Sequence, residues 1–312
     1  MRAAEIQSYG GSDVMKTVSD AAKPTIGPDE VLVAVHAAGI NPFDWKIREG
    51  LVRKMRELSF PAILGGDFAG TIAEVGSNIK NLQPGAAVYG MADPLGNHGS
   101  FAEFTPVKAS SLSTKPIKVD FIQAAALPLA SVSAYKALIE HTNLQSGQKV
   151  LIHGGAGGIG SFAIQIAKHL GAYVATTAAT DEVDYVKERG ADEVIDYTSQ
   201  QFETILKDYD AIYDTVGGEV NKRSYQVLKS GGILVSMVAQ PDEALAKQYN
   251  VKAINEFTQV TTERLTKITE LVDQGILTVH VDKTFPLEQA ADALAYLQSG
   301  KHRGKVVITI KT

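Results

Sequence analysis

Residues 149–160 read KVLIHGGAGGIG, an apolar run followed by a turn in which five of seven residues are glycine. Gly155, Gly157 and Gly160 meet the pattern G-x-G-x-x-G directly after a predicted strand and before a predicted helix. The first glycine permits a tight turn, the second lets the backbone approach a pyrophosphate, and the third lets the helix pack closely on the strand. We expect the phosphates of a dinucleotide at the start of this helix, where Gly158 and Ile159 also lie.

The segments after this turn repeat the order of strand and helix. Predicted strands lie at 149–153, 172–177, 193–197, 211–214 and 232–238, and predicted helices lie at 161–170, 182–188 and 219–228. Strands and helices that alternate at this spacing form parallel βαβ units. This context favours a doubly wound α/β fold that binds a dinucleotide over the alternative, a glycine-rich connection without a ligand.

The segments before and after this region have a different texture. Up to about residue 120, short strands at 30–37, 70–75 and 86–89 are broken by glycine and proline, which indicates irregular antiparallel β structure. An alanine-rich helix over 121–141 then indicates a domain boundary. Helices are predicted at 263–274 and 287–298, and a last strand at 305–310 resembles the first part, so we expect the C-terminus to return to the N-terminal domain.

Composition excludes several classes of function. Cysteine is absent, which removes disulfides, thiolate nucleophiles, cysteine-bound zinc and iron–sulfur clusters. The net charge of −5 comes without a concentrated basic segment, so we expect no nucleic-acid partner. No window of about 18 residues is uninterruptedly apolar, and the N-terminus lacks the apolar core of a signal peptide. We therefore expect a cytoplasmic protein that does not bind membranes.

The end of the second strand of the βαβ region bears on the choice of dinucleotide. Sites for NAD(H) usually carry an acidic residue there, which binds the ribose 2′-hydroxyl. This chain has Thr177 and Thr180 instead, whose hydroxyls can donate to a 2′-phosphate. Asp181 and Glu182 follow and would repel a phosphate that they faced, and no basic residue occurs in the loop until Lys187. We predict NADP(H) over NAD(H); the alternative is that the threonines reflect only β propensity.

Six segments together carry a family resemblance. They are 37–50 (AAGINPFDWKIREG), 63–76 (ILGGDFAGTIAEVG), 97–104 (NHGSFAEF), the glycine turn, 213–218 (YDTVGG) and 300–308 (GKHRGKVVI). The chain closely resembles the zinc-independent quinone oxidoreductase branch of the medium-chain dehydrogenase/reductase superfamily. The resemblance implies NADPH-dependent reduction of quinones or of the C=C bond of α,β-unsaturated carbonyls (enones). Variable loops such as 50–59 and 241–255 are expected to shape the substrate pocket.

The resemblance also implies the architecture. A GroES-like β-rich catalytic domain is expected over residues 1–122 and 262–312, and an inserted Rossmann domain that binds NADP(H) over 123–261. Relatives often form homodimers, and an edge strand near 232–238 is expected to pair across a two-fold axis.

The resemblance further implies that no zinc is bound. Zinc-dependent relatives hold the metal with a cysteine near the position of Asn41 and with a histidine and a glutamate where this chain has Gly66 and Asp67. Asp67 is expected to cap or bond the neighbouring turn, without a catalytic role. Three histidines lack the spacing of a metal site and are expected to be structural: His36, His98 and His153.

The segment NPFDWK, residues 41–46, is expected to contribute the catalytic residues. Without a metal, the carbonyl oxygen of the substrate needs hydrogen-bond donors where negative charge develops. Lys46 is the candidate donor, because related enzymes often place a tyrosine at this position; alternatively, it binds the ribose or phosphate of the coenzyme. Asn41 is expected to face the nicotinamide ribose or carboxamide, and Asp44 to orient the loop or Lys46.

A second set of residues is expected by resemblance to contact the coenzyme. Ser133 matches a hydroxyl at the nicotinamide end, Tyr197 matches a tyrosine at the adenine side, and Phe257 lies in a segment that closes over the coenzyme. Two loops that line the nicotinamide are matched by Val216, Gly217, Met237 and Val238. Arg303 and Lys305 are expected to begin the last strand; the alternative is that they approach the coenzyme. The alternative to an enzyme is a non-catalytic NADPH-binding sensor or structural protein on the same fold.

Overall fold

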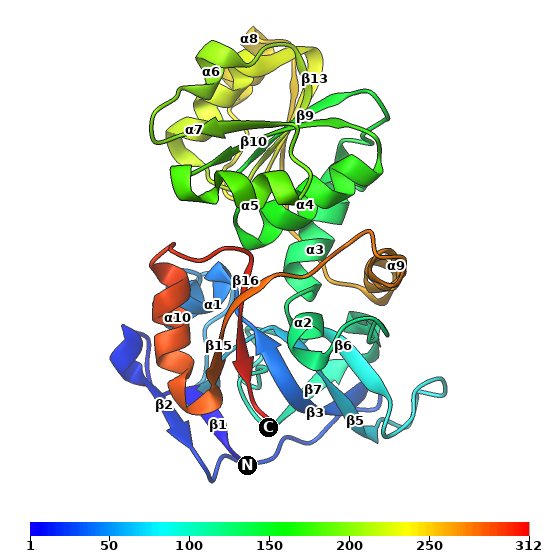
Figure 1. The fold of residues 1–312 in the computed structure, drawn as a ribbon. Coiled ribbons are helices and arrows are strands. Elements are labelled where there is room, and N and C mark those ends of the chain that lie inside the picture. The colour runs from blue at the N-terminus through cyan, green and yellow to red at the C-terminus, as the bar shows by residue number, and fades with distance from the viewer. Residues whose placement is uncertain (312) are drawn as a thin grey trace. The chain divides into compact units, whose positions relative to one another are not determined.

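The computed structural model describes residues 1–311, and the chain divides into two compact units (Figure 1). The β-rich unit comprises residues 1–129, 260–275 and 279–312, and the parallel-sheet unit comprises 130–259 and 276–278. The domain boundaries expected from the sequence were 122/123 and 261/262, and which segments fold as independent domains stays a prediction.

The β-rich unit contains a seven-stranded sheet in the order β15-β16-β3-β5-β6-β8, with β7 also paired to β3. A smaller sheet has the order β2-β1-β4. The strands of the larger sheet are β3 (Glu30–Gly39), β5 (Asp67–Val75), β6 (Ala87–Met91), β7 (Phe104–Lys108), β8 (Leu112–Thr114), β15 (Val281–Pro286) and β16 (Lys305–Thr309). Those of the smaller sheet are β1 (Ala3–Ile6), β2 (Met15–Val18) and β4 (Ala62–Ile63).

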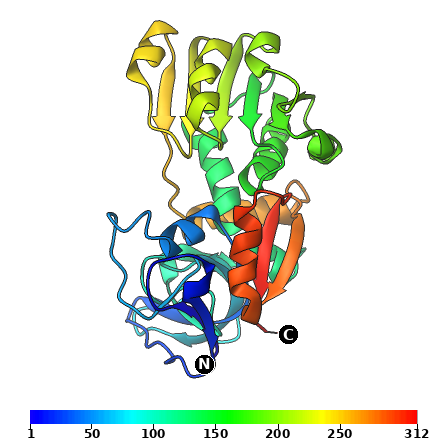
Figure 2. The same cartoon turned by 90° about the vertical axis from the view of Figure 1, so that its left-hand side faces the viewer.

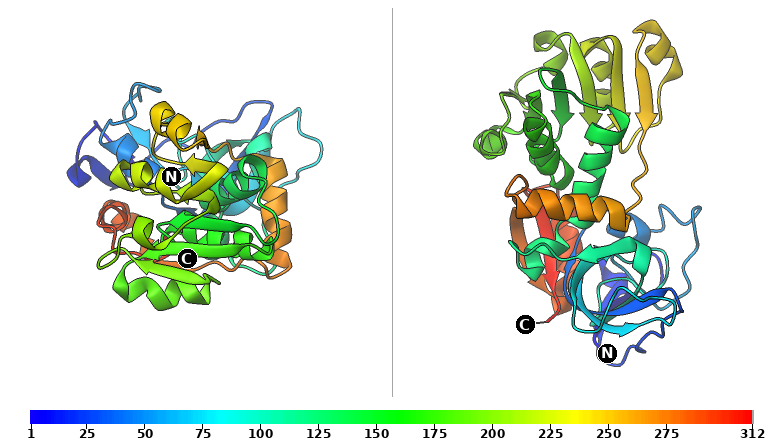
Figure 3. Two further views of the ribbon diagram at one scale, coloured as in Figure 1. Left: turned by 90° about the horizontal axis from the view of Figure 1, so that it is seen from above. Right: turned by 90° about the vertical axis from the view of Figure 1, so that its right-hand side faces the viewer.

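Helices pack on the sheets of the β-rich unit, as Figure 3 shows for α9, drawn in orange. These helices are α1 (Pro42–Arg48), α2 (Phe121–Ala125), α9 (Thr262–Asp273) and α10 (Ala290–Gln298). Most residues of β3 and β5 are buried, in runs rather than in alternation, so their apolar side chains supply much of the core. The last strand, β16, pairs antiparallel with β3, with Val307 opposite Gly39, so the C-terminal segment does return to the N-terminal sheet.

The parallel-sheet unit contains six parallel strands in the order β11-β10-β9-β12-β13-β14 (Figure 2). The strands are β9 (Lys149–His153), β10 (Tyr173–Ala178), β11 (Glu193–Asp196), β12 (Tyr209–Asp214), β13 (Leu228–Ser236) and β14 (Lys252–Asn255). The helices are α4 (Gly158–His169), α5 (Val183–Glu188), α6 (Phe202–Ile205), α7 (Gly218–Ser224) and α8 (Glu243–Gln248). This strand order reverses beside β9, and doubly wound sheets bind ligands at the carboxyl ends of the strands on either side of such a reversal. The expected Rossmann-like α/β fold is therefore present.

Two expectations about local structure were wrong. The helix expected over 121–141 is three elements, because Pro128 lacks an amide hydrogen and begins a new helix. They are α2, α3 (Pro128–Tyr135) and a π-helical turn (Lys136–His141). The strand near 232–238 is not an edge strand, because Ile233–Ser236 of β13 pair with Lys252–Asn255 of β14. The sequence signal for β14 is weak, since it reads KAIN and has no buried residue.

Candidate functional site

The glycine turn joins the end of β9 to the start of α4 in the parallel-sheet unit. A Cβ atom on Gly155 would overlap the Thr176 hydroxyl, and one on Gly160 would overlap the carbonyl oxygen of Gly154. A Cβ on Gly157 would meet only Gly154 O, at 3.4 Å. The first and third glycines are therefore required for packing, while the second borders open space that a ligand can enter.

The backbone of this turn leaves the first amides of α4 for a ligand. Gly155 N donates to Thr177 O at 3.1 Å, and Gly157 N donates to Gly154 O at 3.1 Å. The amides of Gly158, Ile159 and Gly160 lie in the first turn of a helix, where they have no partner within the helix. These amides and the positive end of the helix dipole suit a pyrophosphate. The residues of the turn therefore fit the phosphates of a dinucleotide.

A buried histidine supports the turn from behind. His153 Nε2 lies 2.9 Å from Ser224 Oγ, and Ser224 Oγ donates to Val220 O at 2.7 Å, so the imidazole donates through Nε2. Burial lowers the pKa of His153 to about 4, which keeps the ring neutral. Its Nδ1 lies 3.3 Å from Thr177 Oγ1, which accepts from Gly154 N at 3.1 Å. The buried Thr177 hydroxyl thus holds the glycine turn, and its expected contact with a 2′-phosphate stays a prediction.

The loop after β10 places hydroxyls beside carboxylates. Thr180 Oγ1 donates to Asp196 Oδ2 at 2.6 Å and lies 3.0 Å from Thr198 Oγ1. Hydrogen bonds from these two threonine hydroxyls lower the pKa of the Asp196 carboxyl. Tyr197 is 60% exposed, and partial burial together with the charges of neighbouring carboxylates, Glu182 among them, raises the pKa of its phenol. The predicted adenine-side residues are therefore accessible but lie in acidic surroundings.

Three exposed apolar side chains follow the carboxyl ends of neighbouring strands. Val216 follows β12, Val238 follows β13 and Phe257 follows β14, and they are 54%, 48% and 62% exposed. Gly217 packs against this surface, because a Cβ there would meet Val238 Cγ2 at 2.8 Å. Asp214 fixes the first loop by accepting hydrogen bonds from the amides of Val216 and Gly217, each at 2.9 Å. The structure thus brings these predicted nicotinamide-side residues to one edge of the sheet.

Two further predicted residues lie at the same edge. Met237 N donates to Asp214 O at 3.0 Å, which ties the loop after β13 to β12. The buried Ser133 Oγ lies 2.6 Å from Thr258 Oγ1, next to Phe257. Asp214 was missed by the sequence analysis, although an acidic residue that ends a buried strand before VGG is a recognisable signal for a loop-binding carboxylate.

The β-rich unit contains a buried polar cluster formed by Asn41, Asp67 and Lys305. Lys305 Nζ donates to Asn41 Oδ1 at 2.5 Å and to Ile40 O at 2.9 Å, and lies 3.7 Å from Asp67 Oδ2. Asn41 Nδ2 donates to Asp67 Oδ2 at 2.8 Å. Asp67 Oδ1 accepts from Leu129 N at 3.0 Å. The Asn41 amide is held at both ends, so its orientation is fixed.

Burial dominates the electrostatics of this cluster. It raises the pKa of Asp67 and lowers the pKa of Lys305, although their mutual attraction opposes both shifts. Burial raises the pKa of the neighbouring Asp44 to about 7. Asp44 Oδ2 accepts from Asn41 N at 2.8 Å, and this bond joins the start of α1 to the cluster.

Lys305 begins β16 as expected, and it is also a member of the cluster, which the sequence analysis missed. A lysine at the start of the buried run VVI is a weak signal, because its partner Asn41 lies 264 residues away along the chain.

Lys46 stands apart from the buried cluster on α1. Its side chain is partly exposed, and its ammonium lies 5.7 Å from the centre of the Trp45 ring. Within residues 1–311 it has no hydrogen-bond or ion-pair partner for Nζ, and no contact joins it to Asp44. Its three N–H groups are therefore available to an oxygen of a ligand.

The zinc positions of the family are filled differently here. Gly66 stands at the histidine position, and a Cβ there would lie 3.0 Å from Met91 Cε, the end of a flexible side chain. Within residues 1–311, no three side chains of histidine, cysteine, aspartate or glutamate are grouped so that they could hold a metal ion.

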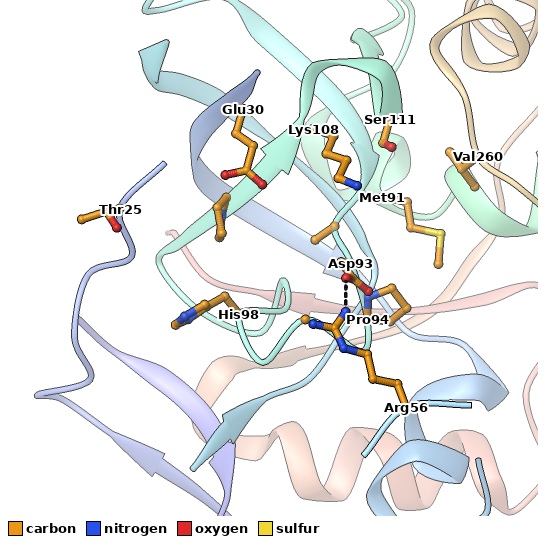
Figure 4. A pocket seen from close by; sticks show the side chains of 13 residues that line it. Thr25, Glu30, Arg56, Met91, Asp93, Pro94, His98, Lys108, Ser111 and Val260 are labelled. Carbon is orange, nitrogen blue, oxygen red and sulfur yellow. Dashed lines mark hydrogen bonds and ion pairs between the residues drawn. The ribbon is translucent and has the colours of Figure 1, made fainter. Parts of the chain in front are cut away.

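A pocket of about 470 Å³ in the β-rich unit contains none of the predicted site residues (Figure 4). It is lined by Met91, Lys108 and other side chains, including Arg56 and Asp93, which form an ion pair at 2.9 Å.

Comparisons with known proteins agree with this geometry. The family of alcohol dehydrogenase GroES-like domains matches residues 27–117, and the zinc-binding dehydrogenase family matches residues 189–308. The chain is 36% identical over 320 residues to a 2-methylene-furan-3-one reductase of Solanum lycopersicum, covering 99% of this chain and 79% of that protein. The chain belongs to the zinc-independent quinone oxidoreductase branch of the medium-chain dehydrogenase/reductase superfamily.

Other members of the branch are similar over comparable lengths. An NADPH-dependent alkenal/one oxidoreductase of Arabidopsis thaliana is 35% identical, covering 99% of this chain and 79% of that protein. The structure of the quinone oxidoreductase from Coxiella burnetii matches with a TM-score of 0.93 at 34% identity, covering 100% of this chain and 99% of that chain. Escherichia coli quinone oxidoreductase complexed with NADPH matches with a TM-score of 0.90 at 26% identity, covering 99% of this chain and 100% of that chain. The chain is thus an enzyme of the oxidoreductase class.

Proposed function

We propose that this chain is an NADPH-dependent reductase that transfers a hydride to the C=C bond of α,β-unsaturated carbonyls or to quinones, without zinc. The observation that carries the proposal is the glycine turn, in which Gly155 and Gly160 are required for packing while Gly157 borders open space. The names of its relatives, an alkenal/one oxidoreductase and quinone oxidoreductases, support the substrate class. An enone and a quinone share the conjugated carbonyl that this chemistry requires.

The residues of the parallel-sheet unit would bind the coenzyme. When bound, NADPH supplies the hydride. Amides of Gly158, Ile159 and Gly160 would hold its pyrophosphate. The apolar surface of Val216, Val238 and Phe257 would cover its nicotinamide ring and exclude water from it.

In the β-rich unit, Lys46 would act on the substrate. Its ammonium would donate a hydrogen bond to the carbonyl oxygen, where negative charge develops as hydride reaches the conjugated system. Asn41 has its amide held by Lys305 and Asp67, so it would present a fixed group rather than a mobile one. Alternatively, Lys46 would bind the ribose or a phosphate of the coenzyme.

For the coenzyme we propose NADP(H) over NAD(H). Tyr197 is exposed at the proposed adenine side, and one relative is named as NADPH-dependent. The Thr180 hydroxyl would have to leave Asp196 Oδ2 to donate to a 2′-phosphate. Glu182 and Asp196 oppose a phosphate in that position because of their charge. A binding titration that compares NADPH with NADH tests the choice, and tighter binding of NADH would overturn it.

The enzymatic proposal is tested by mixing the purified protein with NADPH and then with an enone or a naphthoquinone. We expect the absorbance of NADPH to fall only after the acceptor is added. Tight NADPH binding without oxidation across a broad panel of acceptors would support a non-catalytic coenzyme-binding protein instead.

We also propose a homodimer and a cytoplasmic location. The edge strands of the parallel sheet are β11 and β14, so one of these, rather than β13, would pair across a two-fold axis. Light scattering in solution tests the dimer, and fractionation of cells tests the location. Among residues 1–311, no helix is both long enough and apolar enough to cross a membrane.

A further inference from the structure

A carboxylate is buried between a lysine and a histidine side chain at the end of β14. The side chain of Glu256 is fully buried, with Oε1 3.2 Å from Lys136 Nζ and Oε2 2.9 Å from His141 Nε2. Its backbone is also fixed, because Glu256 N donates to Ser236 O at 2.7 Å. A buried carboxylate is costly unless it is paired, so this arrangement needs an explanation beyond packing.

The π-helical turn over Lys136–His141 explains how both side chains reach one carboxylate. In an α-helix with 3.6 residues per turn, two residues five apart point in directions about 140° apart. In a π-helical turn each amide bonds to the carbonyl five residues earlier, so residue i+5 lies nearly above residue i. Thr142 N donates to Ala137 O at 3.0 Å in this pattern. The turn therefore places Lys136 and His141 on the same side, facing Glu256.

The same side chains fix the segment that follows Glu256. Lys136 Nζ donates to Phe257 O at 2.7 Å, and Thr258 Oγ1 donates to Glu256 Oε1 at 3.0 Å. Thr258 Oγ1 also lies 2.6 Å from the hydroxyl of Ser133. The main chain of Phe257 is thus held by side-chain bonds, while its ring remains 62% exposed at the carboxyl edge of the sheet.

We propose that Glu256 is a positioning residue for the coenzyme. Together with Lys136 and His141 it sets the position of Phe257, and through Phe257 it determines how tightly the nicotinamide half of the coenzyme is bound. This inference rests on the proposed function, since it takes the carboxyl edge of the sheet as the coenzyme face. Phe257 itself touches the coenzyme, whereas Glu256 acts through it.

The test compares two ligands: NADPH and the same molecule without its nicotinamide, 2′-phospho-ADP-ribose. In Glu256→Gln the charge is lost but the shape is kept. We expect its affinity for NADPH to fall on the order of tenfold, as on loss of one well-packed anchor, with affinity for the fragment unchanged. Phe257→Ala should show the same selective loss, and Glu256→Asp a smaller one. Glu219→Gln, on the exposed surface of α7, is the matched control and should bind both ligands normally.

Removing only the carboxylate leaves the partly buried Lys136 without its anion, so a second variant guards against unfolding. Lys136→Met combined with Glu256→Gln removes both members of the lysine–carboxylate pair together, and thermal denaturation checks that the variant is folded. It should show the same selective loss of NADPH affinity. Equal loss for both ligands, or no loss for either, in a folded variant would overturn the positioning role. If the unmodified protein binds neither ligand, the proposed function itself has failed.

Discussion

The glycine turn of the parallel-sheet unit and the Asn41 cluster of the β-rich unit are built in opposite ways. The turn is made by the backbone of consecutive residues, and two of its glycines are required because any side chain would overlap a neighbour. The cluster is made by the side chains of Asn41, Asp67 and Lys305, which are far apart in the sequence. Hydrogen bonds and the attraction between Lys305 and Asp67 hold it together in the buried interior. A local backbone site is visible in a sequence, whereas a buried charge network is visible only in the fold.

The largest effect is expected when the cation of the buried cluster is removed. Lys305→Met would leave Asp67 buried without its cation and would free the Asn41 carbonyl. We expect the free energy of unfolding to fall by about 3–5 kcal/mol in urea denaturation. Lys301→Met, an exposed lysine nearby in the chain, is the matched control. Equal stability of the two variants would show that the cluster does not depend on Lys305.

The second prediction concerns Lys46, which lies outside the cluster. Lys46→Ala should lower kcat by about 10²–10³, as for loss of one donor to a developing oxyanion, with little change in NADPH affinity. Stopped-flow measurement of NADPH oxidation and a separate binding titration check both parts. Lys16→Ala, at an exposed position of β2, should behave like the unmodified enzyme. A loss confined to NADPH affinity would instead assign Lys46 to the coenzyme.

The glycines of the turn should separate into two classes. Gly160→Ala places a Cβ against the Gly154 carbonyl and should cost about 1–3 kcal/mol of stability. Gly157→Ala meets only an atom at 3.4 Å, so it should remain stable but lose NADPH affinity, because the methyl group occupies the ligand's space. Thermal denaturation and coenzyme titration of both variants check this. Similar stability losses in the two variants would contradict the separate roles.

One titratable residue beside each region should contribute to the stability of the protein, and the two contributions should change with pH in opposite directions. Burial raises the pKa of Asp44 from 3.8 to about 7, so the folded state holds a proton that the unfolded state releases, and this contribution to stability is lost as pH rises from 4 to 7. Burial lowers the pKa of His153 from 6.5 to about 4, so its contribution is lost as pH falls from 6.5 to 4. Each effect is at most about 1.4 kcal/mol per pH unit.

Two variants separate these contributions. Asp44→Asn should reduce the loss of stability on raising the pH, and His153→Asn should reduce the loss on lowering it. Urea denaturation between pH 4 and 7 measures both. A pH dependence that both substitutions leave unchanged would contradict the assignment to these two groups.

Much of the fold follows from local patterns in the sequence. The strand at 149–153 and the glycine turn were predicted because an apolar run, a glycine pattern and a helix occur in order. The strand β14 was missed because it is short, with Ala253 and Ile254 its only apolar residues and none fully buried, so it lacks the pattern by which strands are recognised. The π-helical turn was missed for a different reason. It brings Lys136 and His141 to Glu256, which lies 115 positions beyond the turn, so nothing near the turn in the sequence indicates this contact.

In the candidate site, too, contacts between residues far apart in the sequence could not be predicted from local patterns. Val216, Val238 and Phe257 were placed by resemblance, and the parallel sheet brings them to one edge because each follows the carboxyl end of a strand. Lys305 was not expected to join a buried charge cluster, because nothing near it in the sequence indicates the carboxylate that it faces. Long-range pairing of buried charges depends on the sheet register, and the register of β16 against β3 is set by the whole fold.

Oxidation of NADPH by the purified protein, measured before and after treatment with a zinc chelator, tests the central claim most directly. The absorbance of NADPH should fall when an enone or a naphthoquinone is added, at a rate that is the same before and after a zinc chelator. No oxidation with either acceptor, or oxidation that disappears with the chelator and returns with zinc, would contradict a zinc-independent reductase.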